Sequence, residues 1–260
     1  MSVTYSSYLK LDELLALQHP LSDGPEHDET LFIVIHQVYE LWFKQILHEL
    51  DFLKDCLSRH DVPRTLGTLK RILTILKVVV AQIDVLETMT PLEFLSFRAR
   101  LESGSGFQSV QFRELEFVLG AKNAASLERQ LPGSEARRRL ERRLAEPTVW
   151  DAFLRFVAGA GHVVPKAALD RDVTKPVESV QELHPVLIQA YRNDPMTRSV
   201  CERLVDLDEG LQEWRYRHVK MVQRTIGAKI GTGGSSGAEY LMKTLNRPLF
   251  PDLWEIRSEL

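Results

Sequence analysis

The sequence predicts an all-α protein with long central helices, a bundle-like core and essentially no sheet. Apolar residues recur at spacings of three and four along several segments, which is the period of a helix that buries one face. Helix-start signals precede many of these segments. No run of alternating apolar and polar residues indicates a strand, and no linker divides the 260 residues. We therefore expect a single domain, residues 1–260.

Three helices are expected in the first third of the chain. A short helix spans 9–17. Asp28 is expected to cap a long helix, 29–58, because its apolar side chains lie on one face. Pro63 precedes a third helix, 65–87, whose leucines, isoleucines and valines keep the same spacing.

A capping box marks the start of the next helix, and a glycine marks the end of the one after it. The run Thr90-Pro91-Leu92-Glu93 is a capping box with proline at the first helical position, and it opens a helix over 92–101. After a Gly/Ser-rich break, helix resumes over 108–119 and is expected to stop at Gly120.

Two further helices follow hydroxyl caps. Ser134 can cap 135–145, and Thr148 can cap 149–157. The stretch 158–180 holds glycine, proline and scattered charges, so we expect it to be irregular or to carry short turns.

The last long helix, 196–226, is followed by a glycine-rich run. Gly227 is placed to end the helix. The run 231–237 reads GTGGSSG, but it lacks the lysine of a phosphate-binding loop and follows a helix instead of a strand. A flexible linker and a lid over a site both remain open from the residues alone.

Composition and charge exclude several classes of protein. Hydrophobic residues make up 44% of the chain and charged residues 27%, which is ordinary for a soluble globular protein. The net charge of −3 gives no sign of a nucleic-acid partner. The basic run 137–143 lies among Ala, Glu and Leu, so we interpret it as a solvated helix face.

The cysteines and the N-terminus indicate a reducing compartment. Cys56 and Cys201 form no C-x-x-C motif, which excludes a disulfide framework, a cysteine-rich zinc site and covalent haem attachment. The N-terminus does not resemble a secretory signal, and no apolar run reaches membrane-spanning length. We expect a soluble cytoplasmic protein with no membrane partner.

Two histidines lie on apolar helix stripes, His36 in the first long helix and His218 in the last. A polar ring on a buried stripe needs a hydrogen-bond partner or a ligand. Each alone is most simply a satisfied core histidine, but two of them favour a site. His36 and Glu40 are an i, i+4 pair without the HExxH motif of zinc enzymes, and the Glu-x-x-His pairs of di-iron bundles are not present. One axial histidine in an apolar pocket is what haem iron requires.

Phe94 and Arg98 form an i, i+4 pair near a capped helix start. An arginine there is usually a surface residue. If it points inward, its planar guanidinium suits a carboxylate, and an aromatic-lined slot beside it would select an amino acid with a large flat side chain.

Several blocks of sequence resemble the tryptophan 2,3-dioxygenase family. They run from residue 5 to about residue 254 in the expected order, and the segment 121–180 is the least distinctive. The blocks are YSSYL (5–9), HDETLFIVIHQVYELWFK (27–44), FR (97–98), SGFQSVQFR (105–113), WRYRHVKMVQR (214–224) and GTGGSSGAEYL (231–241).

The resemblance implies an all-helical haem enzyme, a homotetramer with one haem b in each subunit. Such an enzyme inserts both atoms of O₂ across the indole C2–C3 bond of L-tryptophan. The product is N-formyl-L-kynurenine, and the reaction is the first step of tryptophan catabolism by the kynurenine pathway.

The resemblance also implies roles for individual residues. His218 matches the axial ligand of the haem iron, and His36 matches the catalytic histidine that hydrogen-bonds the indole N–H. Arg98 matches the residue that pairs with the substrate carboxylate. The remaining substrate-binding positions are Phe32, Phe94 and Thr232.

Other matched positions lie against the haem or come from a second subunit. Ser105 and Gly106 match residues that contact the haem. Tyr5, Tyr8 and Leu9 match residues of an N-terminal segment, 1–20, that completes the pocket of a neighbouring subunit. The glycine-rich residues 227–240 match an active-site loop that orders over bound tryptophan.

Two other functions remain open from the residues. A haem-binding relative that senses or carries would keep His218, but it would not need Arg98, Thr232 and His36 together. A helical scaffold without a cofactor would leave both stripe histidines incidental. Tolerance for substituted tryptophans is also open.

Overall fold

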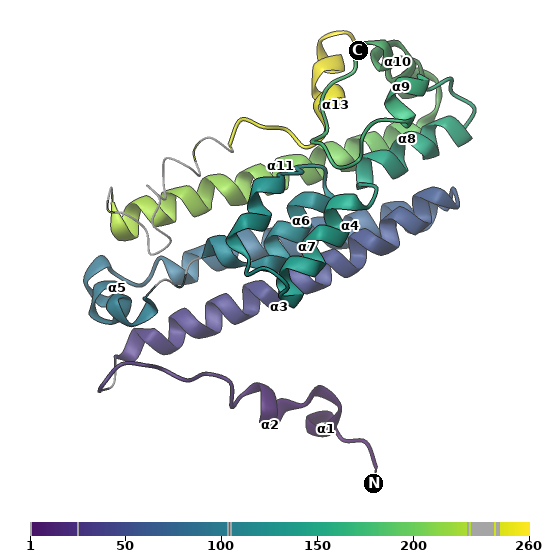
Figure 1. Ribbon diagram of the computed structural model, residues 1–260. Coiled ribbons are helices and arrows are strands. Elements are labelled where there is room, and N and C mark those ends of the chain that lie inside the picture. The colour runs from purple at the N-terminus through teal and green to yellow at the C-terminus, as the bar shows by residue number, and fades with distance from the viewer. Residues whose placement is uncertain are drawn as a thin grey trace.

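The computed structural model describes residues 2–24, 26–102, 104, 106–227, 229, 242 and 245–260. Within these residues every regular element is a helix, which confirms the all-α prediction. Figure 1 shows the long helices lying side by side and the shorter ones gathered along them and at their ends. The α-helices are α1 (Tyr5–Leu9), α2 (Leu11–Leu14), α3 (His27–Ser58), α4 (Val62–Leu86), α5 (Pro91–Arg98), α6 (Val110–Val118), α7 (Glu135–Ala145), α8 (Val149–Gly159), α9 (Lys166–Leu169), α10 (His184–Asn193), α11 (Pro195–Ile226) and α13 (Pro251–Glu255). The short 3-10 turns are Ala99–Leu101, Gly106–Gln108, Ala124–Arg129, Gln181–Leu183 and Ile256–Ser258.

The three longest helices form the frame of the fold. A three-residue turn joins α3 to α4, so these two helices run antiparallel as a hairpin. α4 packs along both α3 and α11, and it therefore holds the first and last long helices in one body. α6 and α8 pack against α3, and α5 lies at one end of the body, in contact with both α3 and α11 (Figure 1).

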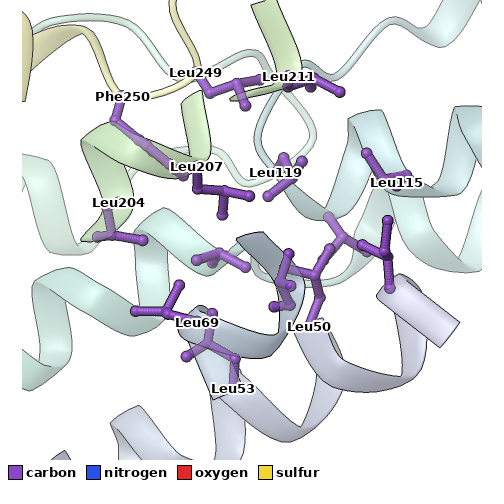
Figure 2. Close-up of a cluster of buried hydrophobic side chains, with 14 of the residues drawn as sticks. Leu50, Leu53, Leu69, Leu115, Leu119, Leu204, Leu207, Leu211, Leu249 and Phe250 are labelled. Atoms are coloured by element: carbon purple, nitrogen blue, oxygen red, sulfur yellow. The ribbon is translucent and has the colours of Figure 1, made fainter. Parts of the chain in front are cut away.

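A leucine-rich core joins these helices (Figure 2). Burial of a leucine side chain contributes about 1.5–3 kcal/mol to folding, so this cluster is a main source of stability. The core also includes Leu249 and Phe250, which follow the glycine-rich run. These two residues pack the C-terminal segment against α11. The labelled members of the core, none more than 3% exposed, are Leu50, Leu53, Leu69, Leu115, Leu119, Leu204, Leu207, Leu211, Leu249 and Phe250.

Most helix starts follow the capping rules that the sequence displays. The Thr90 hydroxyl accepts from the amide of Glu93, and the Glu93 carboxylate accepts from the amide of Thr90 at 2.6 Å. Ser134 and Thr148 cap α7 and α8 as predicted. Gly227, with a φ of +60°, ends α11, which confirms its predicted role as the C-terminal cap.

Three predicted helix starts were wrong by two or three residues, one of them that of α6, which was expected at 108 and begins at Val110. α3 begins at His27, one residue before the predicted cap Asp28, and its N-cap Glu26 makes no side-chain capping bond. α4 begins at Val62, with Asp61 as its cap and Pro63 inside the first turn. Proline is tolerated there because the first amides of a helix have no intrahelical partner.

The N-terminal segment is not the single helix 9–17 that was expected. Thr4 forms a capping box with Ser7 and starts α1 early. Lys10 then adopts a left-handed conformation, φ +54°, which separates α1 from α2. Figure 1 shows both short helices apart from the main body. The two helices α10 and α13 were not predicted, and the otherwise irregular stretch 158–180 carries the single-turn helix α9.

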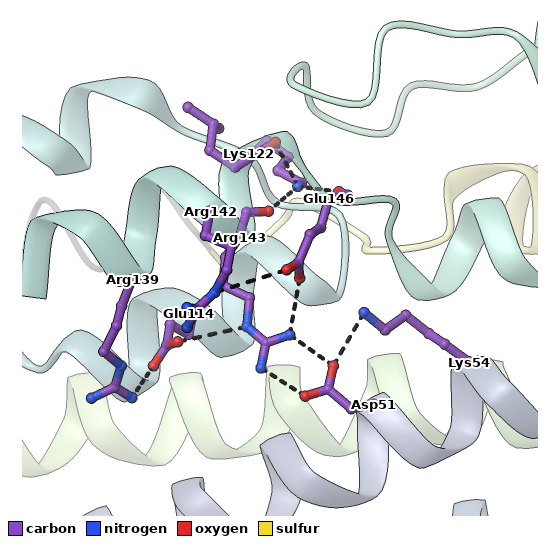
Figure 3. Close-up of polar contacts among 9 residues, drawn as sticks. Asp51, Lys54, Glu114, Lys122, Arg139, Arg142, Arg143 and Glu146 are labelled. Atoms are coloured by element: carbon purple, nitrogen blue, oxygen red, sulfur yellow. Dashed lines mark hydrogen bonds and ion pairs between the residues drawn. The ribbon is translucent and has the colours of Figure 1, made fainter.

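The basic run of α7 is an ion-pair network (Figure 3). Arg143 binds both carboxylate oxygens of Asp51 on α3 at 2.7 Å, and Arg139 pairs with Glu114 on α6. The Lys122 ammonium donates to three carbonyls at the end of α7. Arg138 is exposed, as a solvated face requires, but the Arg143 side chain is only 14% exposed, so that interpretation was wrong for this residue.

A second buried ion pair makes the fold sensitive to acid. Asp151 is 4% exposed, and the Arg171 guanidinium donates hydrogen bonds of 2.6 and 2.9 Å to its carboxylate. Burial raises the pKa of Asp151, but the hydrogen bonds from Arg171 and Thr148 outweigh it and leave the pKa below its ordinary value. The folded state therefore binds fewer protons here, so this pair stabilises the protein above pH ~4 and loses that effect as the pH falls further.

We expect Asp151→Asn to lower the free energy of unfolding by about 3 kcal/mol at pH 7, because it leaves Arg171 buried without a charge partner. The difference from the unmodified protein should shrink below pH ~4, because Asp151 of the unfolded chain then binds a proton that the folded state does not yet bind. Denaturant unfolding at pH 7 and at pH 3.5 measures both quantities. An equal difference at the two pH values would contradict the assignment.

Candidate functional site

The predicted site residues meet at the end of the body where α5 contacts both α3 and α11 (Figure 1). Phe32 and His36 come from the first turns of α3, while Phe94 belongs to α5. His218 lies in the last turns of α11. The two imidazoles are close enough that a charge on His36 would lower the pKa of His218.

His36 is held by its own helix. Its Nδ1 lies 2.7 Å from the carbonyl oxygen of Phe32, one turn earlier. Because a carbonyl only accepts hydrogen bonds, Nδ1 carries the proton, and Nε2 of the neutral ring is left as an acceptor. Burial among protein atoms lowers the pKa of His36, although the Phe32 carbonyl and the Glu40 charge raise it. The ring is therefore neutral at pH 7 and offers an acceptor nitrogen.

The expectation that His36 is buried on an apolar stripe was wrong. Solvent reaches this residue, and His36 is exposed. The apolar stripe of α3 is nevertheless buried at the neighbouring residues Ile35 and Tyr39. His36 lies at the edge of that stripe, where α3 turns from the core toward α5.

Three phenylalanines form an aromatic surface beside His36. The Phe32 ring centroid is 4.1 Å from that of His36 and 5.8 Å from that of Phe94. Phe97 packs at 5.5 Å from both Phe32 and Phe94 and is fully buried. Phe32 and Phe94 are half-buried. Phe97 thus fixes two rings that keep part of their surface open, a role that the sequence did not assign to it.

His218 lies flat against an aromatic ring. Its imidazole is stacked on Trp214 with a centroid distance of 5.1 Å and an interplanar angle of 4°. Burial, together with the charges of His36 and Arg113, lowers the pKa of His218 to about 4, so the ring is neutral at pH 7. Among the described residues, neither ring nitrogen forms a hydrogen bond. The side chain still keeps part of its surface accessible.

These properties fit an axial ligand of haem iron. A neutral imidazole with a free nitrogen is the form that binds iron. Among the described residues, no group of three or more His, Cys, Asp or Glu side chains is placed to share a metal ion. Iron at His218 would therefore need ligands that do not come from these side chains, and the four nitrogens of a porphyrin are such ligands.

Arg98 lies one turn after Phe94, at the end of α5 that carries the phenylalanines. It is half-buried and interacts with neighbouring groups. Arg98 is thus partly enclosed on the helix that carries Phe94 and Phe97, and its contact with a substrate carboxylate stays a prediction.

Polar contacts that the sequence did not predict join α6 to α3 and to α11. Glu116, only 8% exposed, accepts hydrogen bonds from Arg113 on α6 and from Arg215 on α11. Gln111 donates to both the carbonyl and the carboxylate of Glu40, at 2.8 and 2.9 Å. Arg113 and Glu116 are an i, i+3 pair that is visible in the sequence, but the contacts of Glu116 with Arg215 and of Gln111 with Glu40 join different helices and leave no signal there.

The structure does not bring Tyr5, Tyr8 or Leu9 to this place. Tyr5 and Tyr8 on α1 are each 77% exposed and Leu9 is 42% exposed, and α1 lies apart from the body (Figure 1). Gly106 begins the 3-10 turn before α6. Ser105, Thr232 and nearly all of the predicted loop 227–240 lie outside the described residues.

Membrane insertion finds no support in the helices. None of those that the structure describes is both long and apolar enough to span a bilayer.

Comparison with known proteins assigns the chain to a family. The family model for tryptophan 2,3-dioxygenase matches residues 1–157 and 176–260. The tryptophan 2,3-dioxygenase of Herpetosiphon aurantiacus is 60% identical, over 100% of this chain and 99% of that protein. That of Anaeromyxobacter sp. strain K is 55% identical over 100% and 97%. The tryptophan 2,3-dioxygenase 1 of Ralstonia nicotianae is 41% identical over 100% and 88%. The unmatched residues, 158–175, fall within the segment that resembled the family least. The chain as a whole belongs to the tryptophan 2,3-dioxygenase family.

Proposed function

We propose that the chain is a haem-dependent dioxygenase that inserts both atoms of O₂ across the indole C2–C3 bond of L-tryptophan. The product is N-formyl-L-kynurenine, and the reaction is the first step of the kynurenine pathway. One observation carries this proposal: a neutral His36 with a free acceptor nitrogen adjoins half-open phenylalanine rings at the end of the body that holds His218. This arrangement matches an indole, which is flat, apolar and a hydrogen-bond donor at one edge.

The cofactor of this proposal is haem b, one per subunit, with His218 as its axial ligand. When bound, the haem supplies the iron at which O₂ is activated. The neutral imidazole of His218 needs no proton removed before it can act as a ligand. Gly106, at the start of the turn that leads into α6, is proposed to lie against the cofactor together with Ser105.

His36 positions the substrate in this mechanism. Its Nε2 accepts a hydrogen bond from the indole N–H and thereby fixes the orientation of the C2–C3 bond. It is not a base that ionises the indole, since the indole N–H is a far weaker acid than imidazolium and burial lowers the pKa of His36 still further. The hydrogen bond from Nδ1 to Phe32 keeps the acceptor nitrogen directed away from α3.

The remaining pocket residues recognise the amino acid part and the ring. Phe32 and Phe94 provide flat surfaces for the indole. Arg98 is proposed to bind the α-carboxylate through two parallel hydrogen bonds. Thr232 is proposed to contact the ammonium or carboxylate group.

The N-terminal segment supports contact with a neighbouring subunit, as in the proposed homotetramer. Apolar side chains stay exposed along residues 3–21, and α1 and α2 have no buried residues, so a second surface that covers them would remove this apolar area from water. We propose that Tyr5, Tyr8 and Leu9 complete the pocket of a neighbouring subunit. The exposed apolar residues are Val3, Tyr5, Tyr8, Leu9, Leu14, Leu15, Leu17 and Leu21.

The activity is tested directly with haem-loaded, reduced protein and L-tryptophan in air. We expect absorbance of N-formylkynurenine to grow in the near ultraviolet and to stop when O₂ is removed. A protein with a normal haem spectrum that forms no product would sink the catalytic proposal and leave a non-catalytic haem protein.

His36→Ala should keep its haem and lose about 10- to 100-fold in kcat/KM, because a hydrogen bond that orients the substrate is worth roughly 1.5–3 kcal/mol when one partner is desolvated. Steady-state kinetics measure the loss, and the absorption spectrum monitors the haem. His48→Ala is the matched control, since His48 is an exposed histidine on the same helix. If the two variants behave alike, His36 does not contact the substrate.

Arg98→Ala should raise KM for L-tryptophan roughly 10- to 100-fold, since the carboxylate loses a charged partner. Arg98→Lys should recover only part of the affinity, because an ammonium cannot form two parallel hydrogen bonds. Arg100→Ala serves as the control, because Arg100 is exposed and pairs with Asp23. An unchanged KM in Arg98→Ala would remove Arg98 from the pocket.

A further inference from the structure

His218 lacks the contact that usually orients a metal-binding histidine. Such a ligand almost always donates its second ring N–H to a carboxylate or a backbone carbonyl, which fixes the plane of the ring. In the part of the chain that the structure describes, the ring of His218 forms no hydrogen bond. Something else must hold the plane of this imidazole if it is to present one nitrogen to a metal.

The comparison with His36 makes the difference concrete. Both histidines have an aromatic residue four positions earlier on the same helix, Phe32 for His36 and Trp214 for His218. Residues four apart lie on one face of a helix and can touch. His36 bonds to the carbonyl of Phe32 and is tilted by 39° from its ring, whereas His218 lies within 4° of parallel to the Trp214 ring.

Trp214 is itself fixed from three sides. It is 8% exposed, and the rings of Phe43, Phe112 and Tyr39 surround it at centroid distances of 6.0, 4.9 and 6.4 Å. Phe43 meets it edge-on at 88°. These neighbours come from α3 and α6, so the indole cannot rotate without disturbing the contacts between helices. A rigid flat surface therefore lies against one face of the His218 ring.

We propose that Trp214 is the positioning residue for the metal ligand His218 and that its ring face sets the plane of the imidazole in place of a hydrogen bond. This inference rests on the proposed haem function and names a residue that acts through His218. The two rings lie within 4° of parallel, so the ring face of Trp214 and not its N–H makes the contact.

The test compares two substitutions in haem-loaded protein. Trp214→Phe keeps a flat ring and removes the N–H, while Trp214→Leu removes the ring. In the reduced, oxygen-free protein, the iron–histidine stretching band in resonance Raman spectra reports the orientation of the ligand. We expect Trp214→Phe to keep the position and width of the band and Trp214→Leu to shift and broaden it.

A second readout measures how firmly the cofactor is held. Transfer of haem to excess apomyoglobin should be roughly two- to tenfold faster in Trp214→Leu, the factor that corresponds to the loss of one aromatic pair. Trp150→Leu is the matched control. Trp150 is 2% exposed and stacks on Phe250, so its loss should lower the melting temperature without altering the Raman band.

The outcomes separate this inference from the proposed function. If Trp214→Leu keeps the band and the transfer rate of the unmodified protein, the stack does not orient His218, although the enzyme proposal survives. A shifted band in Trp214→Phe would also overturn the inference, because it would assign the effect to the N–H, and this arm decides the matter even if Trp214→Leu fails to fold. If the unmodified protein binds no haem or shows no iron–histidine band, both proposals fall.

Discussion

The packing of Tyr39, Phe43 and Phe112 around Trp214 is the interaction on which the geometry of the site depends. It joins α3, α6 and α11 at a place where α4 is otherwise the main link between the first and last long helices. His36 lies three residues before Tyr39, and His218 lies four after Trp214. Because a helix is rigid over one turn, the cluster sets where both imidazoles lie. Close packing of large rings leaves few alternative arrangements, so the two histidines share one frame.

The sequence predicted the fold where local signals and packing agree. The stripes of α3, α4 and α11 and the caps Thr90, Ser134 and Thr148 were sufficient, because burial of one face and satisfaction of the first amides are properties of adjacent residues. The prediction from the sequence failed in the N-terminal segment, where no buried side chains favour one backbone conformation over another. Lys10 takes a left-handed conformation in a segment without buried residues, and there the Thr4 capping box decides the structure.

For the site, the residue types and their family resemblance could be predicted, but the contacts could not. The spacing of Phe32 and His36 is visible in the sequence, yet the proton position on His36 follows from a 2.7 Å contact that only a folded helix shows. Burial of His36 was wrongly expected because a stripe defines a helix face and not its edge. Glu116 has Arg113 three residues before it on α6, but its contact with Arg215 forms only when α11 packs against α6. A pair so far apart in the sequence leaves no periodic trace.

The two histidines show how one scaffold produces two different imidazoles. The N–H at Nδ1 of His36 donates to the Phe32 carbonyl, so Nε2 remains as the one acceptor. This suits a group that must accept a hydrogen bond from a defined direction. The stack on Trp214 is proposed to constrain the plane of the His218 ring, and it uses neither ring nitrogen for a hydrogen bond. This suits a group that is proposed to give a lone pair to a metal. Both rings are neutral at pH 7, so protonation does not compete with either proposed function. The difference between the two imidazoles therefore arises from whether each contacts a carbonyl or a ring face of the preceding turn.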